Sequence, residues 1–99
     1  MKKTMTSSYD VAEHLRTPKE MAAYLEAIID ESQGDTSLIT KAIGDIARAK
    51  GMTMVARESG LSRESLYKAL SGATSPSFDT ILKVLQALGL KLHAEVARS

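Results

Sequence analysis

The stretch GLSRESLYKALSG (60–72) describes one short helix between two glycines. Gly60 opens a tight turn, and Ser62 is placed to cap the helix, because a serine hydroxyl can accept a hydrogen bond from an amide of the first turn. We expect the helix over 63–71, with its few apolar residues turned toward a core. The outer face then carries the polar side chains Arg63, Glu64, Tyr67 and Lys68.

A second short helix is expected immediately before this one, over 53–59. Two short helices joined by a tight turn that contains glycine form a helix-turn-helix arrangement. In this arrangement the second helix enters the major groove of DNA, and the first helix lies across the backbone. The groove is about 12 Å wide, so the helix that fits it has to be polar outside and anchored by few apolar residues inside.

The polar face of the second helix offers groups that suit nucleic acid. Arg63 or Lys68 could donate to guanine, and Glu64 could accept from cytosine or hold Arg63 in position. Tyr67 could pack on a thymine methyl group or donate to a phosphate. The Ser65 hydroxyl and the amides that begin both helices suit phosphates. Polar outer faces are also ordinary on solvated helices, so the interpretation depends on the joint pattern of both helices, the turn and the following loop.

Capping signals predict the remaining helices. The segment TPKE (17–20) combines an N-cap threonine, a proline at the first helical position and a glutamate that completes a capping box. This helix is expected to reach about Ser32. Asp35 is expected to cap a second long helix that ends at Lys50, and Ser77 is expected to cap the last helix. The expected buried positions of these three helices are Met21, Tyr24, Leu25, Ile28, Ile29, Leu38, Ile39, Ala42, Ile43, Ile46, Ala47, Phe78, Ile81, Leu82, Leu85 and Leu88.

The tail LKLHAEV (90–96) alternates apolar and polar residues, which predicts a β-strand. A single strand leaves backbone N–H and C=O groups unpaired, so it could pair across a two-fold axis or with residues near Tyr9. The stretch 9–15 fits a short helix without requiring one. The expected fold is therefore all-α, a helix-turn-helix bundle of five to six helices with a short C-terminal β-strand.

Composition excludes several classes of function. The 99 residues suffice for one domain, and the absence of cysteine excludes disulfides and thiolate metal sites. No apolar run approaches the roughly 18 residues of a membrane span, and no secretory signal follows the first lysines, so we expect a soluble, cytoplasmic protein without membrane contact. His14 and His93 lack companions at ligand spacing. No nucleophile elbow or glycine-rich phosphate loop is present, so we expect no enzyme, metal, cofactor or small-molecule substrate.

The charge is unevenly distributed along the chain. Residues 1–34 hold four Lys/Arg and six Asp/Glu, whereas residues 35–99 hold nine and six, so the two parts carry −2 and +3. This asymmetry is compatible with a nucleic-acid face on the second part and a basic partner on the first. A solvated helix face explains Glu26, Asp30 and Glu31 equally well.

The segment ARESGLSRESLYKALSGATSPSFDTILKVLQALGL (56–90) resembles the lambda-repressor-like, XRE-type helix-turn-helix domain, in which an alanine of the first helix stands four residues before the turn glycine. Three further segments extend the similarity: YDVAEHLRTPKEMAAYLEAIIDE (9–31), AIGDIARAKGMT (42–53) and LGLKLHA (88–94). Together they resemble addiction-module antidote proteins, the HigA-type antitoxins. The resemblance spans roughly 9–94, in the expected order.

This resemblance implies a function and a set of site residues. Members bind a small ribonuclease-type toxin from the adjacent gene, neutralise it and repress the shared promoter. Position by position, the resemblance implies that Ser62, Arg63, Glu64, Tyr67 and Lys68 belong to the helix that reads DNA. It also implies that Thr53 and Met54 lie near the backbone, and that Thr74, Ser75 and Ser77 can touch phosphate. Met54 stands where the family usually has glutamine.

We therefore expect an antitoxin that is also a repressor of its own operon. The expected organisation is a flexible N-terminus (1–8), an N-terminal helical extension (9–34) and a helix-turn-helix DNA-binding domain with its C-terminal strand (35–99). A homodimer on operator double-stranded DNA is expected, because a palindrome needs two reading helices about one DNA turn apart. Two alternatives stay open: a stand-alone repressor without a toxin, and a protein-interaction module that has lost DNA binding.

Overall fold

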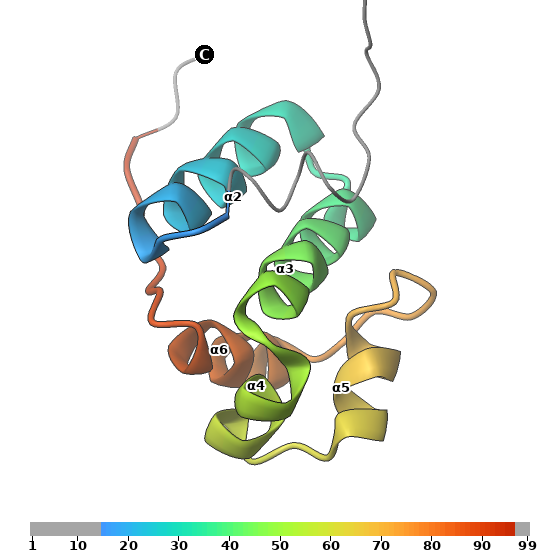
Figure 1. Cartoon of the computed structure of the whole chain (residues 1–99). Helices are drawn as coiled ribbons and strands as arrows, with labels where there is room; N and C mark the ends of the chain where they lie inside the picture. Colours follow the sequence, from blue (N-terminus) through green and yellow to red (C-terminus); the bar gives the residue numbers. More distant parts are fainter. Residues whose placement is uncertain (1–14, 97–99) are drawn as a thin grey trace, which may run out of the picture.

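The computed structural model describes residues 15–96, and this part of the chain folds into helices and connecting loops (Figure 1). The expected flexible N-terminus (1–8) and most of the possible helix over 9–15 lie outside the described residues. Leu15, the first described residue, is buried. The helices are α2 (Pro18–Ser32), α3 (Thr36–Lys50), α4 (Met52–Ser59), α5 (Arg63–Ala69) and α6 (Phe78–Ala87).

The start of α2 confirms the predicted capping box. The Thr17 hydroxyl accepts from the Glu20 amide at 3.1 Å, and the Glu20 carboxylate accepts from the Thr17 amide at 3.2 Å. Both bonds satisfy amides that the helix itself leaves unpaired. The helix ends at Ser32 as predicted. Its C-cap is Gln33, in the left-handed region at φ 51°, one residue before Gly34.

The other predicted caps are also confirmed. The Asp35 carboxylate accepts from the Ser37 amide at 3.1 Å and from the Ser37 hydroxyl at 2.7 Å, and these bonds lower the pKa of Asp35 below its usual value. The Ser77 hydroxyl accepts from the Thr80 amide at 3.1 Å. Each cap fixes where its helix begins, and so fixes the lengths of the loops before α3 and α6.

The helices form two groups that share one core. In Figure 1, α2 lies across the top of α3, and α3 runs down toward α4, α5 and α6. The helix α4 contacts α3, α5 and α6. The largest side chains that are almost wholly removed from solvent come from α3 to α6 and the residue after each of the last two helices: Ile46, Val55, Leu66, Leu70, Val84, Leu85 and Leu88.

A hydrogen bond between α2 and α3 supplements this aliphatic core. The Tyr24 hydroxyl donates to the Asp45 carboxylate at 3.0 Å, and Arg48 pairs with the other Asp45 oxygen at 3.3 Å. Partial burial, the hydrogen bond and the negative charge of Asp45 together raise the pKa of Tyr24 to about 12. Tyr24 therefore stays protonated and remains a donor at neutral pH.

Three residues expected in the core lie on the surface instead. Phe78 is 64% exposed, Leu38 46% and Ile29 41%. Phe78 is the first residue of α6, where the helix has only begun to approach its neighbours, and Leu38 lies in the first turn of α3. Spacing of apolar residues places a side chain on one face of a helix, but it does not show how far the covering neighbour extends.

The predicted strand over 90–96 is wrong. Within the described residues no segment is in β-structure, and 91–96 is an exposed coil after α6. Leu90 still packs on the core, and its amide donates to the Leu85 carbonyl at 2.9 Å. A strand needs a second extended segment to pair its backbone groups, and residues 15–96 provide none. Alternation alone therefore misidentified this tail.

No helix in the described part of the chain is long and apolar enough to cross a membrane. Between residues 15 and 96, no group of three or more His, Cys, Asp or Glu residues is arranged to hold a metal ion.

Candidate nucleic-acid interface

The helix α5 is anchored by two leucines and leaves the rest of its surface to solvent. Leu66 is 0% exposed and Leu70, just after the helix, is 2% exposed. Arg63, Glu64 and Lys68 are exposed, as predicted for the polar face. The helix ends at Ala69, two residues earlier than expected.

A close backbone approach positions the end of α5 against α3. A Cβ atom built on the buried Gly44 would lie 3.0 Å from the carbonyl oxygen of Leu70. Only a residue without a side chain lets the two segments meet at this distance. Gly44 therefore sets how far α5 projects from the rest of the molecule.

The N-terminus of α5 is capped by a pair of serines. The Ser62 hydroxyl accepts from the Ser65 amide at 3.0 Å and donates to the Ser65 hydroxyl at 2.9 Å. The two hydroxyls therefore lie in hydrogen-bond contact with each other at the start of α5. Ser62 and Ser65 are two of the six predicted phosphate contacts.

Arg63 and Tyr67 form one stacked unit on the outer face. The guanidinium lies 5.7 Å from the centre of the Tyr67 ring, and its Nη2 donates to the Tyr67 hydroxyl at 3.4 Å. Glu64 makes no ion pair within residues 15–96, so in this structure Arg63 is positioned by Tyr67 and not by Glu64. The one-turn spacing of Arg63 and Tyr67 brings them together, and stacking on the ring leaves most of the guanidinium donors available.

The loop after α5 presents two hydroxyl residues. The Ser71 hydroxyl donates to the Lys68 carbonyl at 3.0 Å and accepts from the Ala73 amide at 3.1 Å, which turns the chain away from α5. Thr74 and Ser75 follow, both exposed, and neither makes a hydrogen bond within the described part of the chain. Ser77 is less available, because its hydroxyl caps α6 and donates to Thr80 at 3.0 Å.

The start of α4 carries the remaining predicted contact. Thr53 and Met54 are exposed, and Met52 is buried beneath them. Gly51 precedes the helix and supplies no side chain to cap it. The amides at the start of α4 therefore lack the side-chain acceptor that α5 and α6 have.

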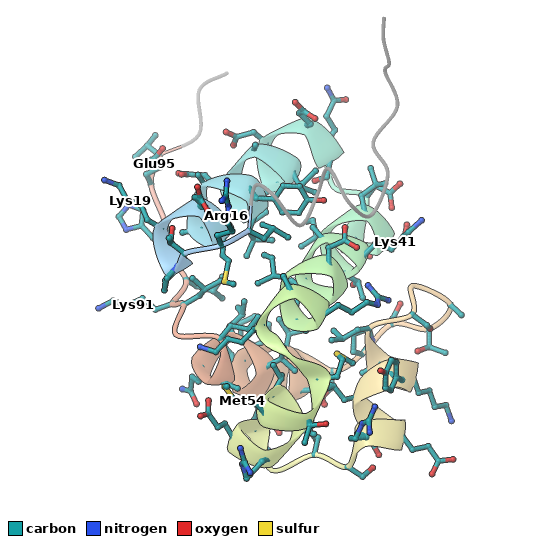
Figure 2. All side chains as sticks on the ribbon, viewed as in Figure 1. Arg16, Lys19, Lys41, Met54, Lys91 and Glu95 are labelled. Carbon is teal, nitrogen blue, oxygen red and sulfur yellow. The ribbon has the colours of Figure 1, made fainter. Side chains whose placement is uncertain are left out.

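Lys41 was not identified by sequence reasoning. Its stem packs on the loop glycine, since a Cβ on Gly72 would lie 3.0 Å from Lys41 Cγ. Figure 2 shows Lys41 projecting outward from α3, above the 71–77 loop in this view. Only the packing of the loop on α3 brings this cation to Gly72, and no local signal in the sequence marks it.

The same loop closes a groove against α3 and α6. The groove has a volume of about 340 Å³ and is lined by the start of α3, the loop 72–76 and residues of α6. Its apolar wall is formed by Ile39, Ile43 and Ile81, with Phe78 beside them. Thr40 also lines the groove and is only 6% exposed.

These features define a small helical domain that presents one short, externally polar helix next to a second short helix across a three-residue turn.

The chain is similar to known proteins over most of its length. Residues 5–96 match the family described as "Probable addiction module antidote protein", and the chain belongs to this family. It is 48% identical to an uncharacterised protein of Haemophilus influenzae over 90 residues, which make up 91% of each chain. No solved structure matches the chain.

Membership in this family identifies the protein as an antidote of an addiction module, and such antidotes are not enzymes. The function of an antidote implies a toxin as partner. The expected antitoxin role is confirmed at this level.

Proposed function

We propose that this antidote neutralises a small ribonuclease-type toxin encoded by the adjacent gene and represses its own operon by binding operator DNA through α5. The observation that carries the DNA-binding part is the geometry of α5. The buried side chains of this segment are Leu66 and Leu70, and the helix presents Arg63, Glu64, Tyr67 and Lys68 to solvent. The resemblance to HigA-type, XRE-like domains supports the same assignment.

In this proposal, α5 enters the major groove as the second helix of a lambda-repressor-like helix-turn-helix, 53–71. Arg63 and Lys68 donate to guanine, Glu64 accepts from cytosine, and Tyr67 packs on a thymine methyl group while supporting Arg63. The contacts to phosphate come from Thr53, Ser62, Ser65, Thr74, Ser75 and Ser77, to which the packing on the loop adds Lys41.

The proposed DNA-binding unit is a homodimer. One protomer supplies few cations to phosphate, and a palindromic operator has two half-sites about 34 Å apart on the same face of the duplex. Two copies of α5 related by a two-fold axis satisfy this spacing.

Co-expression tests the antitoxin part of the proposal. The short open reading frame beside the gene is induced alone and together with this protein, and growth is followed. Arrest alone and recovery together are expected. Absence of arrest would contradict a toxin partner and would favour the stand-alone repressor.

Binding of the purified protein to its own promoter fragment tests the second part. Binding that persists in the presence of excess unrelated duplex is expected. Failure to bind any duplex at low salt would favour the interaction module that has lost DNA binding.

A further inference from the structure

Three polar side chains connect α2 to the end of α5 across the second half of α3. The Tyr24 hydroxyl of α2 donates to one oxygen of the Asp45 carboxylate at 3.0 Å, and the other oxygen of Asp45 pairs with Arg48 at 3.3 Å. Asp45 and Arg48 are three residues apart, so they are neighbours on one face of α3. A continuous polar contact therefore runs from α2 to the guanidinium of Arg48.

The guanidinium of Arg48 lies at the place where the end of α5 meets α3. A Cβ atom built on Gly44 would lie 3.4 Å from Arg48 Nη1 and 3.0 Å from the carbonyl oxygen of Leu70. Gly44 and Arg48 are four residues apart, so the arginine side chain leans over the glycine on the same face of the helix. Both atoms therefore border the small space that the glycine leaves open.

The positive charge of Arg48 suits this end of α5. The last carbonyl groups of a helix lack an intrahelical partner and carry partial negative charge, so a nearby cation is stabilising. Leu70 is the C-cap of α5, and its carbonyl oxygen belongs to this group. The only hydrogen bond of Arg48 within the described residues goes to Asp45, so Arg48 acts on Leu70 as a neighbouring charge that Asp45 holds in place.

The exposure of the ion pair indicates where its effect lies. The side chains of Arg48 and Asp45 are 53% and 37% exposed. Exposed ion pairs contribute little to the stability of a protein. We therefore expect Arg48 to affect the position of the end of α5 more than the stability of the fold.

We propose that Arg48 is a positioning residue for α5, which sets where the end of this helix lies, and that Tyr24 holds Arg48 in place through Asp45. The consequence for DNA rests on the proposed function of α5. A hydrogen bond to a base edge depends on distance and angle, and base contacts carry the sequence information that phosphate contacts lack. A displaced α5 should therefore lose discrimination between DNA sequences before it loses affinity for DNA in general.

DNA discrimination by variants of the full chain tests this role. The affinities of wild type, Arg48→Ala and Arg48→Lys are measured for a duplex from the protein's own promoter and for a scrambled duplex of the same composition, at two salt concentrations. Arg48→Ala should lower the ratio of the two affinities about three- to tenfold. Its affinity for the scrambled duplex and the salt dependence should match those of wild type. Arg48→Lys keeps the positive charge and should restore part of the ratio.

Two simpler roles of Arg48 give different results. If Arg48 contacts a phosphate directly, Arg48→Ala weakens binding to both duplexes, reduces the salt dependence and leaves the ratio unchanged. If Arg48 only stabilises the fold, the thermal midpoint falls and the ratio is again unchanged. Either result overturns the proposal. Lys83→Ala is the matched control, because Lys83 forms an exposed ion pair with Asp79 on α6 at 3.1 Å, and this variant should keep the ratio of wild type.

The connection to α2 is tested on the free protein labelled with ¹⁵N. The Leu70 amide donates to the Leu66 carbonyl at 3.0 Å, so its resonance reports on the last turn of α5. Tyr24→Phe should shift the amide resonances of Leu70 and Ser71. In an Arg48→Ala background the same substitution should leave both resonances in place, because the connection is already broken. Equal shifts in both backgrounds, or no shift in either, would overturn the role of Tyr24.

The outcomes also separate this inference from the proposed function. If wild type binds both duplexes equally, α5 reads no sequence, and the proposed function fails together with the role of Arg48 in discrimination. If wild type discriminates and Arg48→Ala discriminates equally well, the inference alone is overturned.

Discussion

The stacking of Arg63 on Tyr67 joins two side chains of the proposed base-reading face. A stacked guanidinium loses less freedom when it donates to a base, because its position is already restricted. Replacement of Arg63 by Ala should therefore weaken binding to the operator by about 1–3 kcal/mol and relax specificity at one base pair.

Fluorescence anisotropy with operators varied at each base pair checks this prediction. Lys19→Ala is a suitable control, because Lys19 is an exposed cation at the start of α2, far from α5 in Figure 2. The control should bind within about 0.5 kcal/mol of wild type. If Arg63→Ala discriminates among the operators as wild type does, Arg63 reads no base.

The substitution Gly44→Ala is expected to lower the stability of the fold, in contrast to most Gly→Ala substitutions in helices. At most helical positions Gly→Ala stabilises by about 0.5–1 kcal/mol. Here the new Cβ would lie 3.0 Å from the Leu70 carbonyl oxygen, so Gly44→Ala should instead destabilise by about 1–3 kcal/mol. Urea unfolding measures the difference, and a stabilised variant would show that α3 and the end of α5 are not in tight contact.

Sequence reasoning succeeded where a residue acts on its own neighbours. Thr17, Asp35, Ser62 and Ser77 were each predicted as caps, and each accepts a hydrogen bond from an amide two or three residues later. Contacts between distant segments left no such signal. The bond from Tyr24 to its carboxylate partner crosses 21 positions, and only the packing of α2 on α3 creates it.

At the scale of single helices, the cap of α5 is expected to dominate its stability, because a helix of seven residues has little else to hold its first turn. Ser62→Ala should lower the free energy of unfolding by about 1 kcal/mol. Ser62→Asp, which retains an acceptor, should restore most of the loss. Urea unfolding of both variants checks this, and equal stability of Ser62→Ala and wild type would refute a role for the cap.

The hydrogen bond of Tyr24 between α2 and α3 is expected to make the stability of the protein depend on pH. The pKa of Tyr24 is about 12 in the folded protein, above its ordinary value of 10.0, so the folded state holds this proton more strongly. Its contribution to stability is present below pH 10 and is lost as the pH rises toward 12. Tyr24→Phe should be less stable by about 1 kcal/mol at neutral pH and should lose less stability between pH 10 and 12.

Thermal unfolding as a function of pH measures this difference. Wild type and variant differ in no other titratable group, so their comparison isolates the tyrosine. If the thermal midpoints of wild type and Tyr24→Phe fall equally steeply above pH 10, Tyr24 does not cause the difference in stability.

The residues at which helices begin were easier to predict from the sequence than the contacts that the helices make with other segments. The starts of α2, α3, α5 and α6 follow from their caps, and the turn at Gly60 follows from its left-handed conformation, φ 81°. The tail 90–96 and the exposed Phe78 were mispredicted for one reason. Strand pairing and burial both depend on a neighbour from elsewhere in the chain, which periodicity cannot reveal.

At the scale of the whole molecule, α2 and α5 lie at opposite ends of the fold in Figure 1. The proposed DNA-binding face on α5 therefore leaves the surface of α2 available to a protein partner. The predicted charge asymmetry fits this separation, although the loop groove beside α3 and Lys41 were found only in the structure. The base-reading residues themselves remain a prediction from sequence.

Discrimination between DNA sequences tests the central claim most directly. The affinity of the full chain is measured for a duplex from its own promoter and for a scrambled duplex of the same length and composition, at two salt concentrations. The account predicts binding to the promoter at least about 10³-fold tighter than to the scrambled duplex, with both affinities falling as salt rises. Equal affinity for the two duplexes would contradict it, because α5 would then read no sequence.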